Sequence, residues 1–342
     1  MAKEKLKILR RAFKYRAYPN KGTYKRAIRA MVEYAVNIWN PALEERQTTY
    51  HQSLEDDSIK PVNSYRAQYG LVRKKEHPEF SLFNAESMQD VLIKLDSSFK
   101  SFFALIKKDP TARPPRSKGI HRCLTYRQKS GWTLIGNILY IRNIGKFRLR
   151  LHRPIIGEIK TVSITKPAGG PQWYVSFSCD LGPEQPKTAG TKTTTLSVEP
   201  NIFVKDSTGR IIEHPRFYFT EIEKLRRLAR SLSRKQKGSK NRKKAKYTLN
   251  KWHKKMAAKR KYFLWKIANY YIANFDIISI PKLPIKNILQ QTTSAKAQRL
   301  CDAAYSLFFD MLRQKARENG KIIEEYVLSN EKIYESVYGS VA

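Results

Sequence analysis

Apolar and basic residues alternate near the start of the chain. Residues 13–18 read Phe-Lys-Tyr-Arg-Ala-Tyr, and the turn pair Pro19-Asn20 follows. A period of two predicts a β-strand with one apolar and one charged face. We therefore expect a short edge strand here.

The pattern then changes to a helical period. Apolar residues recur at three- and four-residue spacing until Asn40-Pro41, which should end the first helix; they are Ala27, Ile28, Met31, Val32, Ala35, Val36 and Trp39. Helical patterns return at residues 63–75 and 84–106. The second of these carries an apolar stripe that favours a helical-bundle core and requires no cofactor: Met88, Val91, Leu92, Leu95, Phe99, Phe102 and Phe103.

Short apolar runs separated by Gly or Pro follow, up to Asp180. They predict a small β-barrel with strands at residues 134–135, 138–141, 146–151, 162–164 and 173–178. We expect the strand at residues 13–18 to complete this barrel. The helices between Thr23 and Lys108 are then an insertion into it.

The remainder of the chain predicts a second domain. Residues 183–192 contain Pro183, Pro186 and Gly190 and favour a linker. Candidate strands follow at 193–198, 202–205 and 210–213, then a long helical pair, a strand at 277–280, a helix at about 295–318 and a strand at 322–328. Three antiparallel strands followed by alternating helix and strand are typical of the RNase H fold.

Charge indicates the kind of partner. The 342 residues include 67 Lys and Arg against 29 Asp and Glu, a net charge of +38 with a pI near 10.1. Such an excess favours a polyanionic partner. We expect no membrane association and a cytoplasmic location, because the sequence has no long apolar run and begins with charged residues. The separated Cys123, Cys179 and Cys301 favour neither disulfides nor a zinc pair.

The helical pair carries much of this charge. No acidic residue occurs between Lys224 and Lys266, whereas apolar residues such as Leu225, Trp252 and Met256 keep a helical spacing. This combination predicts a folded hairpin with basic outer faces that bind phosphates rather than a disordered tail. Gly238-Ser239 marks its tip, where backbone amides and the hydroxyl would approach a phosphate.

These segments resemble the TnpB family of transposon-encoded, RNA-guided DNA nucleases. The hairpin tip SLSRKQKGSKNRKKAK at 231–246, followed by Trp252-His253-Lys254-Lys255, is similar to that family's hallmark, and residues 15–19, 95–103, 115–118, 144–149 and 173–177 are similar to its other elements. The resemblance implies a wedge β-barrel at 1–22 and 109–182 and a helical recognition insert at 23–108. After a linker at 183–192, it implies a RuvC domain of RNase H-like fold at 193–342, with the basic hairpin at 221–274.

Departures from the family affect the expected chemistry. Glu199 occupies the position of the family's first catalytic Asp, Pro281 occupies that of the second acid, and the chain ends at Ala342 without the four-cysteine zinc element and third acid. A two-metal site needs several converging carboxylates. We therefore expect no metal, no catalytic residue and no enzymatic activity, as in the nuclease-dead TldR relatives, which are RNA-guided repressors.

The resemblance also implies partners. It implies a guide RNA with an omega-RNA-like scaffold and double-stranded target DNA with a short adjacent motif. We expect a monomeric protein without other cofactors, associated with the nucleoid when bound to its target. The residues expected to read the motif are Gln89, Asn63, Ser64, Thr125 and Gln128. Those expected to contact nucleic-acid backbone are Lys14, Arg16, Arg116, Lys118, Arg227, Arg230, Arg234, Lys237, Ser239, Lys240, Arg242, Lys243, Lys244, Lys254 and Arg260.

We therefore expect an RNA-guided, sequence-specific DNA-binding protein without nuclease activity. It would repress transcription by forming an R-loop that blocks RNA polymerase at a promoter. Two alternatives stay open. One is a guide-independent RNA-binding or chaperone protein, which the charge alone would permit. The other is an active RNA-guided nuclease whose metal site is rearranged around Glu199, with acids such as Glu213, Asp302 or Glu324.

Overall fold

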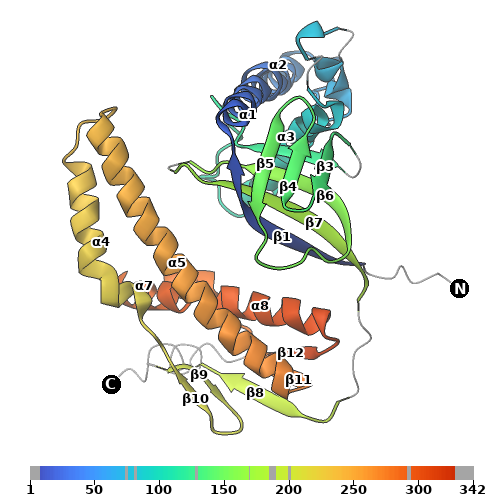
Figure 1. Ribbon diagram of the computed structural model, residues 1–342. Coiled ribbons are helices and arrows are strands. Elements are labelled where there is room, and N and C mark those ends of the chain that lie inside the picture. The colour runs from blue at the N-terminus through green and yellow to red at the C-terminus, as the bar shows by residue number, and fades with distance from the viewer. Residues whose placement is uncertain are drawn as a thin grey trace, which may run out of the picture. The chain divides into compact units, whose positions relative to one another are not determined.

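A computed structural model places the chain in two compact units (Figure 1). Residues 8–73, 76–80, 83–127, 130–168, 170–184, 190–198, 202–290 and 294–327 are described. The barrel unit is Arg10–Gly182, and the hairpin unit is Pro183–Ala342 together with Met1–Leu9. Two predicted site residues, Gln128 and Glu199, lie outside the described residues.

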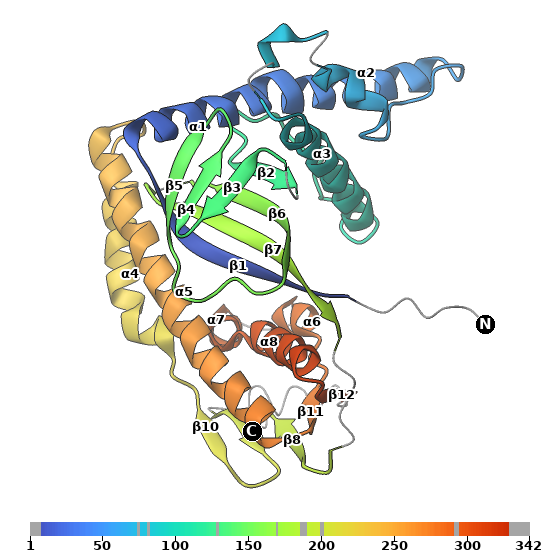
Figure 2. The ribbon, with the colours of Figure 1, turned by 45° about the vertical axis from the view of Figure 1, so that its right-hand side comes forward.

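The barrel unit is built on a nearly closed, seven-stranded sheet with the order β2-β6-β7-β1-β5-β4-β3 (Figure 2). Its strands are β1 (Ile8–Pro19), β2 (Cys123–Arg127), β3 (Trp132–Ile135), β4 (Ile138–Ile141), β5 (Gly145–Arg150), β6 (Glu158–Thr165) and β7 (Trp173–Pro183). The predicted strand with one apolar and one charged face is confirmed at residues 13–18. Phe13, Tyr15 and Ala17 are buried, whereas Lys14 and Arg16 face solvent. β1 is longer than predicted and lies inside the sheet, paired antiparallel with β5.

Helices are inserted between β1 and β2. They comprise α1 (Lys21–Tyr34), a π-helical turn η1 (Ala35–Trp39), α2 (Asn40–Glu55), the 3₁₀ segments η2 (Ala67–Val72) and η3 (Pro78–Phe80), and α3 (Ala85–Ile106). The prediction that Asn40-Pro41 ends the first helix is wrong. Pro41 stands in the first turn of α2, where its missing N–H costs nothing, and the π-helical turn before it absorbs the change of register.

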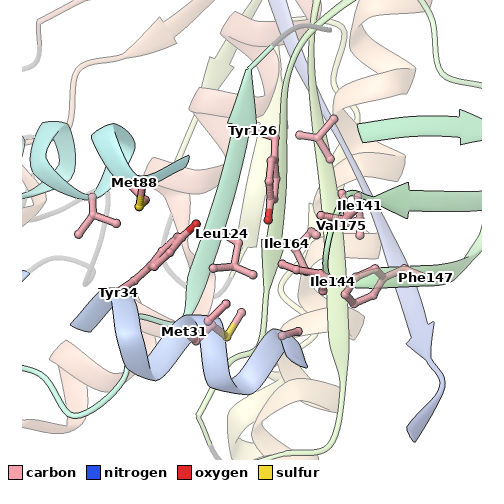
Figure 3. Close-up of a cluster of buried hydrophobic side chains, with 14 of the residues drawn as sticks. Met31, Tyr34, Met88, Leu124, Tyr126, Ile141, Ile144, Phe147, Ile164 and Val175 are labelled. Atoms are coloured by element: carbon pink, nitrogen blue, oxygen red, sulfur yellow. The ribbon is translucent and has the colours of Figure 1, made fainter. Parts of the chain in front are cut away.

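Apolar side chains of the helices and the sheet form one core. Figure 3 shows Met31 and Tyr34 of α1 beside Leu124 and Tyr126 of β2, with Met88 from α3 nearby. The predicted apolar stripe of α3 is buried only over its first half. Phe99 and Phe102 are partly exposed and Phe103 is 57% exposed, which corrects the expectation that the whole stripe is core.

The hairpin unit has a five-stranded sheet with the order β10-β9-β8-β11-β12. Its strands are β8 (Thr193–Ser197), β9 (Ile202–Asp206), β10 (Ile211–Glu213), β11 (Ile277–Pro281) and β12 (Ile322–Tyr326). β8, β9 and β10 are antiparallel, whereas β11 is parallel to both β8 and β12. Mixed α/β content and the nearly closed sheet of the barrel unit confirm that part of the predicted fold class.

The helices of this unit are α4 (Phe217–Ser233), α5 (Lys240–Asn274), α6 (Ile285–Gln290), α7 (Ser294–Ala303) and α8 (Tyr305–Glu318). The single helix predicted at 295–318 is divided at Ala304, whose φ of 54° is left-handed. Leu264, Tyr271 and Phe308, from α5 and α8, pack with Ile278 and Ile280 of β11 in a second core. Within the described residues, no helix is long and apolar enough to cross a membrane.

Candidate nucleic-acid interface

The tip of the α4–α5 hairpin is fixed by its own polar residues. Gly238 has a φ of 89°, which a residue with a side chain rarely adopts, and the hydroxyl of Ser239 caps α5 by accepting the N–H of Arg242. The Arg242 guanidinium donates to the carbonyl oxygens of Leu232 and Lys235 at 2.9 and 2.8 Å. It therefore satisfies the end of α4, where the helix dipole also favours a cation.

The base of the hairpin is held by a buried ion pair. Arg260 of α5 lies 2.6 Å from Asp302 of α7, whose side chain is 0% exposed, and the other Asp302 oxygen accepts the backbone N–H of Tyr218 in the first turn of α4. One carboxylate thus joins α4, α5 and α7. Arg260 was predicted to contact nucleic-acid backbone, and the structure gives it this structural bond.

Further along the hairpin, cations stack on an aromatic ring. The ammonium groups of Lys224 and Lys255 lie 3.9 and 4.5 Å from the ring centroid of Trp252. The predicted backbone contacts Lys237, Lys240, Lys243, Lys244 and Lys254 are all exposed on the tip or along α5. They form a solvent-facing row of positive charge.

Arginines of α4 line a hollow of about 620 Å³. Three of the predicted backbone contacts, Arg227, Arg230 and Arg234, are exposed and lie there, together with Arg226, Ser231, Lys235 and one acid, Glu223. Guanidinium groups bind phosphate oxygens with two parallel hydrogen bonds. The hollow therefore has the composition of a phosphate-binding surface.

The barrel unit presents its own cations. Lys14 lies 4.5 Å from the ring centroid of Tyr174, and Arg16 lies 5.1 Å from that of Tyr18. The segment of Arg116 and Lys118 is held to the junction of η1 and α2. The Trp39 indole donates to the Arg116 carbonyl, and the Asn40 side chain accepts the N–H of Lys118 and donates to its carbonyl. These bonds fix the segment rather than leave it as a loose loop.

A cluster of basic side chains lies beneath this segment. The Lys118 ammonium stands over the Trp39 ring, and His121 packs against the same ring with a centroid distance of 5.7 Å. Burial and the nearby charge of Lys94 together lower the pKa of Lys118 to about 8. Burial and the charges of Lys94 and Lys118 lower the pKa of His121 to about 3. His121 is therefore neutral in the folded protein at neutral pH.

The predicted motif readers lie in different surroundings. Thr125 is buried under α3, where its hydroxyl accepts from Lys94 at 2.6 Å and lies 3.2 Å from that of Ser163. The Ser64 hydroxyl accepts the N–H of Ala67. Gln89 is partly exposed on α3, and Asn63 is exposed and lines a hollow between α2 and α3. Their role in reading DNA stays a prediction.

The end of β11 was the predicted position of a degenerate metal site. Because β8 and β11 are parallel, their carboxyl ends lie at the same edge of the sheet. Pro281 offers no side-chain donor there, and Asp276, at the start of β11, is bound to Lys321. Over the described residues, no three His, Cys, Asp or Glu side chains gather as metal ligands. The described residues do not fit a two-metal centre at this edge.

The acids considered for a rearranged site are dispersed. Asp302 is paired with Arg260, Glu324 accepts from Ser279 on the neighbouring strand, and Glu213 is exposed on β10. Sequence reasoning missed Arg46, Asp96 and Lys94, which are polar residues on apolar helix faces. Asp96 and Lys94 have partners one turn away on α3, but the Arg46–Asp96 and Lys94–Thr125 contacts join residues 50 and 31 positions apart, which no local pattern marks.

The barrel unit with its inserted helices and the basic hairpin on a mixed sheet both present exposed cations of the kind that bind phosphate groups. Comparison with known families gives a more specific assignment. Residues 176–292 match the OrfB_IS605 family, described as a probable transposase, and residues 9–55 match its helix-turn-helix domain. Both matches support the predicted resemblance to the TnpB family over these two segments.

The individual relatives share about a quarter of their aligned residues with this chain. The chain is 27% identical to a putative RNA-guided DNA endonuclease of Streptomyces pristinaespiralis over 92% of its length and 76% of the relative's. It is 24% identical to the putative RNA-guided DNA endonuclease InsQ of Escherichia coli K12, over 63% of its length and 52% of the relative's. Among solved structures, the Cas12f1 chain of a Cas12f1–sgRNA–target DNA complex superimposes with a TM-score of 0.54 at 10% identity, covering 94% of this chain and 89% of that one.

These comparisons correct one prediction. The expectation that the chain is not an enzyme is contradicted, because both relatives are named RNA-guided DNA endonucleases and the family is described as a transposase. The expectation rested on Glu199 and Pro281 at the positions of two acids and on the lack of a third acid and a zinc element in this sequence. Glu199, at the position of the first acid, lies outside the described residues. Pro281 alone does not determine the activity.

Proposed function

We propose that this chain is an RNA-guided, sequence-specific DNA-binding protein. The observation that carries the proposal is the hairpin, which holds exposed cations along two helices while no acid occurs between Lys224 and Lys266. Such a surface repels itself unless a polyanion covers it. The RNA-guided relatives, and the sgRNA and target DNA named for the Cas12f1 structure, support RNA and DNA as the polyanions.

Division of labour between RNA and protein follows from this proposal. The guide RNA pairs with one DNA strand and supplies the sequence specificity, while the protein holds the duplex through its backbone. Exposed cations such as Arg230 and Lys243 suit this role, because phosphate contacts position a nucleic acid without reading its sequence. A short DNA motif beside the target is then the only sequence that the protein itself reads.

For the output of the bound complex, we propose repression by occupancy. An R-loop held at a promoter blocks RNA polymerase sterically, and this effect requires binding only. A reporter whose promoter carries the guide-matched site should lose expression when protein and guide RNA are both present. Equal silencing with a scrambled guide would contradict guided repression.

RNA-guided DNA cleavage is a second candidate function, favoured by the names of both relatives. Incubation of the purified complex with guide-matched duplex and Mg²⁺ measures it directly. Guide-dependent scission would add cleavage to the proposed binding. Uncut but stably bound duplex would leave occupancy as the output.

Guide-independent RNA binding is the remaining alternative. Sequencing the RNA that co-purifies with the protein separates it from the proposal. One defined scaffold joined to a guide segment is the expected result. A mixed pool of cellular RNA would favour a general RNA-binding protein instead.

A further inference from the structure

The barrel unit contains a hollow whose ligand the proposed function does not specify. It measures about 700 Å³ and lies between α2, α3, residues 61–63 and Pro114. Tyr50 of α2 and Phe99, Phe102 and Phe103 of α3 line it. Tyr50 and Phe103 are 54% and 57% exposed, although large aromatic side chains normally gain by burial. Several exposed aromatic residues around one cavity are typical of a binding site rather than of a free surface.

A buried cation lines the hollow. Arg46 lines it with a side chain only 4% exposed, and its guanidinium stands 5.3 Å from the Phe99 ring centroid. Its Nε donates to Gln68 at 2.7 Å and its Nη1 to Asp96 at 3.3 Å. Its Nη2 is buried without a hydrogen-bond partner within the described part of the chain. A buried N–H without a partner costs free energy that an acceptor on a bound ligand would recover.

The hollow also has a positive surplus. Asp96 is the one acid in its lining, and it is bound by both Arg46 and Lys100, the latter at 2.9 Å. The site therefore combines flat apolar surface, one guanidinium NH₂ group without a partner, the Asn63 amide and no free carboxylate. A nucleobase matches all of these features, because it has two aromatic faces, acceptor atoms on its edge and a phosphate close by.

We propose that this hollow binds one unpaired nucleobase of the target DNA, an inference that rests on the proposed function. The base would stack on Phe103 and accept a hydrogen bond from Arg46 Nη2, with Asn63 facing its edge. DNA is favoured over RNA because the lining is largely aromatic and aliphatic. A buried ribose 2′-hydroxyl would lose its hydration there, whereas a deoxyribose would not.

The test uses the purified protein with its co-purified guide RNA. Guide-matched duplexes carry 2-aminopurine at one position at a time, along the adjacent motif and the displaced strand. This fluorescent base is quenched when it stacks. We expect one position at which the probe is unpaired from the complementary strand and yet stays quenched in the wild-type complex. At this position the fluorescence should be about threefold higher in the complex of Phe103→Ala. Phe103→Trp should keep the quenching, because indole also stacks.

Matched variants keep the test specific. Leu105 is 49% exposed on the same helix but does not line the hollow, so Leu105→Ala controls for loss of exposed apolar surface. Phe103→Ala should weaken duplex binding about tenfold, while Leu105→Ala leaves it within about twofold. Phe103→Leu should behave like Phe103→Ala. Thermal melting of each variant verifies that the barrel unit remains folded.

Three results would overturn the inference. In the first, DNA binds under RNA guidance but no probe position changes in fluorescence when Phe103 is replaced. In the second, only 2-aminopurine placed in the guide RNA responds. In the third, Phe103→Leu binds the duplex as tightly as the wild type, which would indicate an aliphatic contact. In each case guided DNA binding itself still stands. Loss of all guide-dependent DNA binding by the wild-type complex would instead refute the proposed function, and the nucleobase site with it.

Discussion

At the scale of single residues, His121 shows how burial controls charge. Its ring is 5% exposed, both ring nitrogens are without hydrogen-bond partners among the described residues, and Trp39 packs against it. Lys94 and Lys118 are the charged groups that act on it, and both oppose a second positive charge. Protonating this imidazole therefore requires the surrounding structure to open.

This arrangement predicts a loss of stability in acid. The pKa of His121 falls from 6.5 to about 3 on folding, so the unfolded chain takes up a proton first as the pH decreases. The contribution is fully present above pH 6.5 and is lost progressively below it. Between pH 7 and pH 5 the free energy of unfolding should fall by about 2 kcal/mol from this residue.

Chemical denaturation of the wild type and of His121→Phe at both pH values checks the prediction. Phenylalanine keeps the ring against Trp39 but cannot be protonated, so the variant should lose about 2 kcal/mol less than the wild type over this interval. Subtracting the loss in the variant from the loss in the wild type cancels the contribution of other titrating groups such as His214. Equal losses would show that His121 does not couple folding to pH.

Burial of apolar residues was predictable from spacing, whereas burial of polar residues was not. The alternation at Phe13, Tyr15 and Ala17 identified the inward face of β1 correctly. Arg46 is buried because Gln68 and Asp96, 22 and 50 residues away, complete its hydrogen bonds. Such partners come together only through the tertiary fold, so a sequence pattern cannot reveal them.

At the scale of elements, the ion pair between Arg260 and Asp302 joins three helices. Removing the arginine would leave a fully buried carboxylate without its counter-charge, at the start of α4. The adjacent Lys259 makes a looser pair with Glu221 at 3.7 Å, and its side chain is 45% exposed. The two neighbouring residues therefore offer a matched comparison.

Arg260→Ala should lower the free energy of unfolding of the protein by about 3 kcal/mol, because an uncompensated buried charge is costly. Lys259→Ala should cost less than about 1 kcal/mol, as expected for an exposed pair. Denaturant titration monitored by circular dichroism measures both. Similar small losses for the two variants would show that Asp302 finds another partner.

Strand and helix positions were largely predictable, but their junctions were not. Because Gly and Pro mark strand ends, the predicted bounds of most strands in the barrel unit lie within a few residues of the observed bounds. The π-helical turn at Ala35–Trp39 and the left-handed Ala304 have no local sequence signal. Both depend on how the flanking helices pack, which overrides intrinsic preference.

At the scale of the whole molecule, the proposed function makes positive charge a main determinant of affinity for nucleic acid. The net charge of +38 is concentrated in part on the hairpin, where Arg227, Arg230 and Arg234 face one hollow of α4. If these side chains contact phosphates, each contact releases a counter-ion. The slope of log affinity against log salt concentration then gives the number of phosphate contacts.

Changing Arg227, Arg230 and Arg234 together to Gln should reduce the slope of log affinity against log salt concentration by about 2 to 3. Arg313→Gln serves as a control, since Arg313 is already paired with Asp310 and Glu325. Its slope should equal that of the wild type. Filter-binding titrations of the co-purified RNA over a range of salt concentrations give the three slopes. An unchanged slope for the triple variant would exclude this hollow from the RNA contact.

The general architecture was accessible from the sequence because periodicity and turn residues mark a barrel and a mixed sheet. The candidate interface was accessible in outline, because an acid-free run with helical apolar spacing predicts a basic hairpin. Its detail was not. Arg242 and Arg260 look like phosphate contacts in the sequence, yet the fold gives both of them bonds within the protein.

Guided recognition of DNA is the central claim, and one affinity measurement tests it most directly. The purified complex, with its co-purified RNA, is titrated with a duplex matched to the guide and with a duplex of scrambled target but identical flanking motif. We expect the matched duplex to bind at least about a hundredfold more tightly at physiological salt. Equal affinity for the two duplexes would contradict RNA guidance and leave only general binding of nucleic acid.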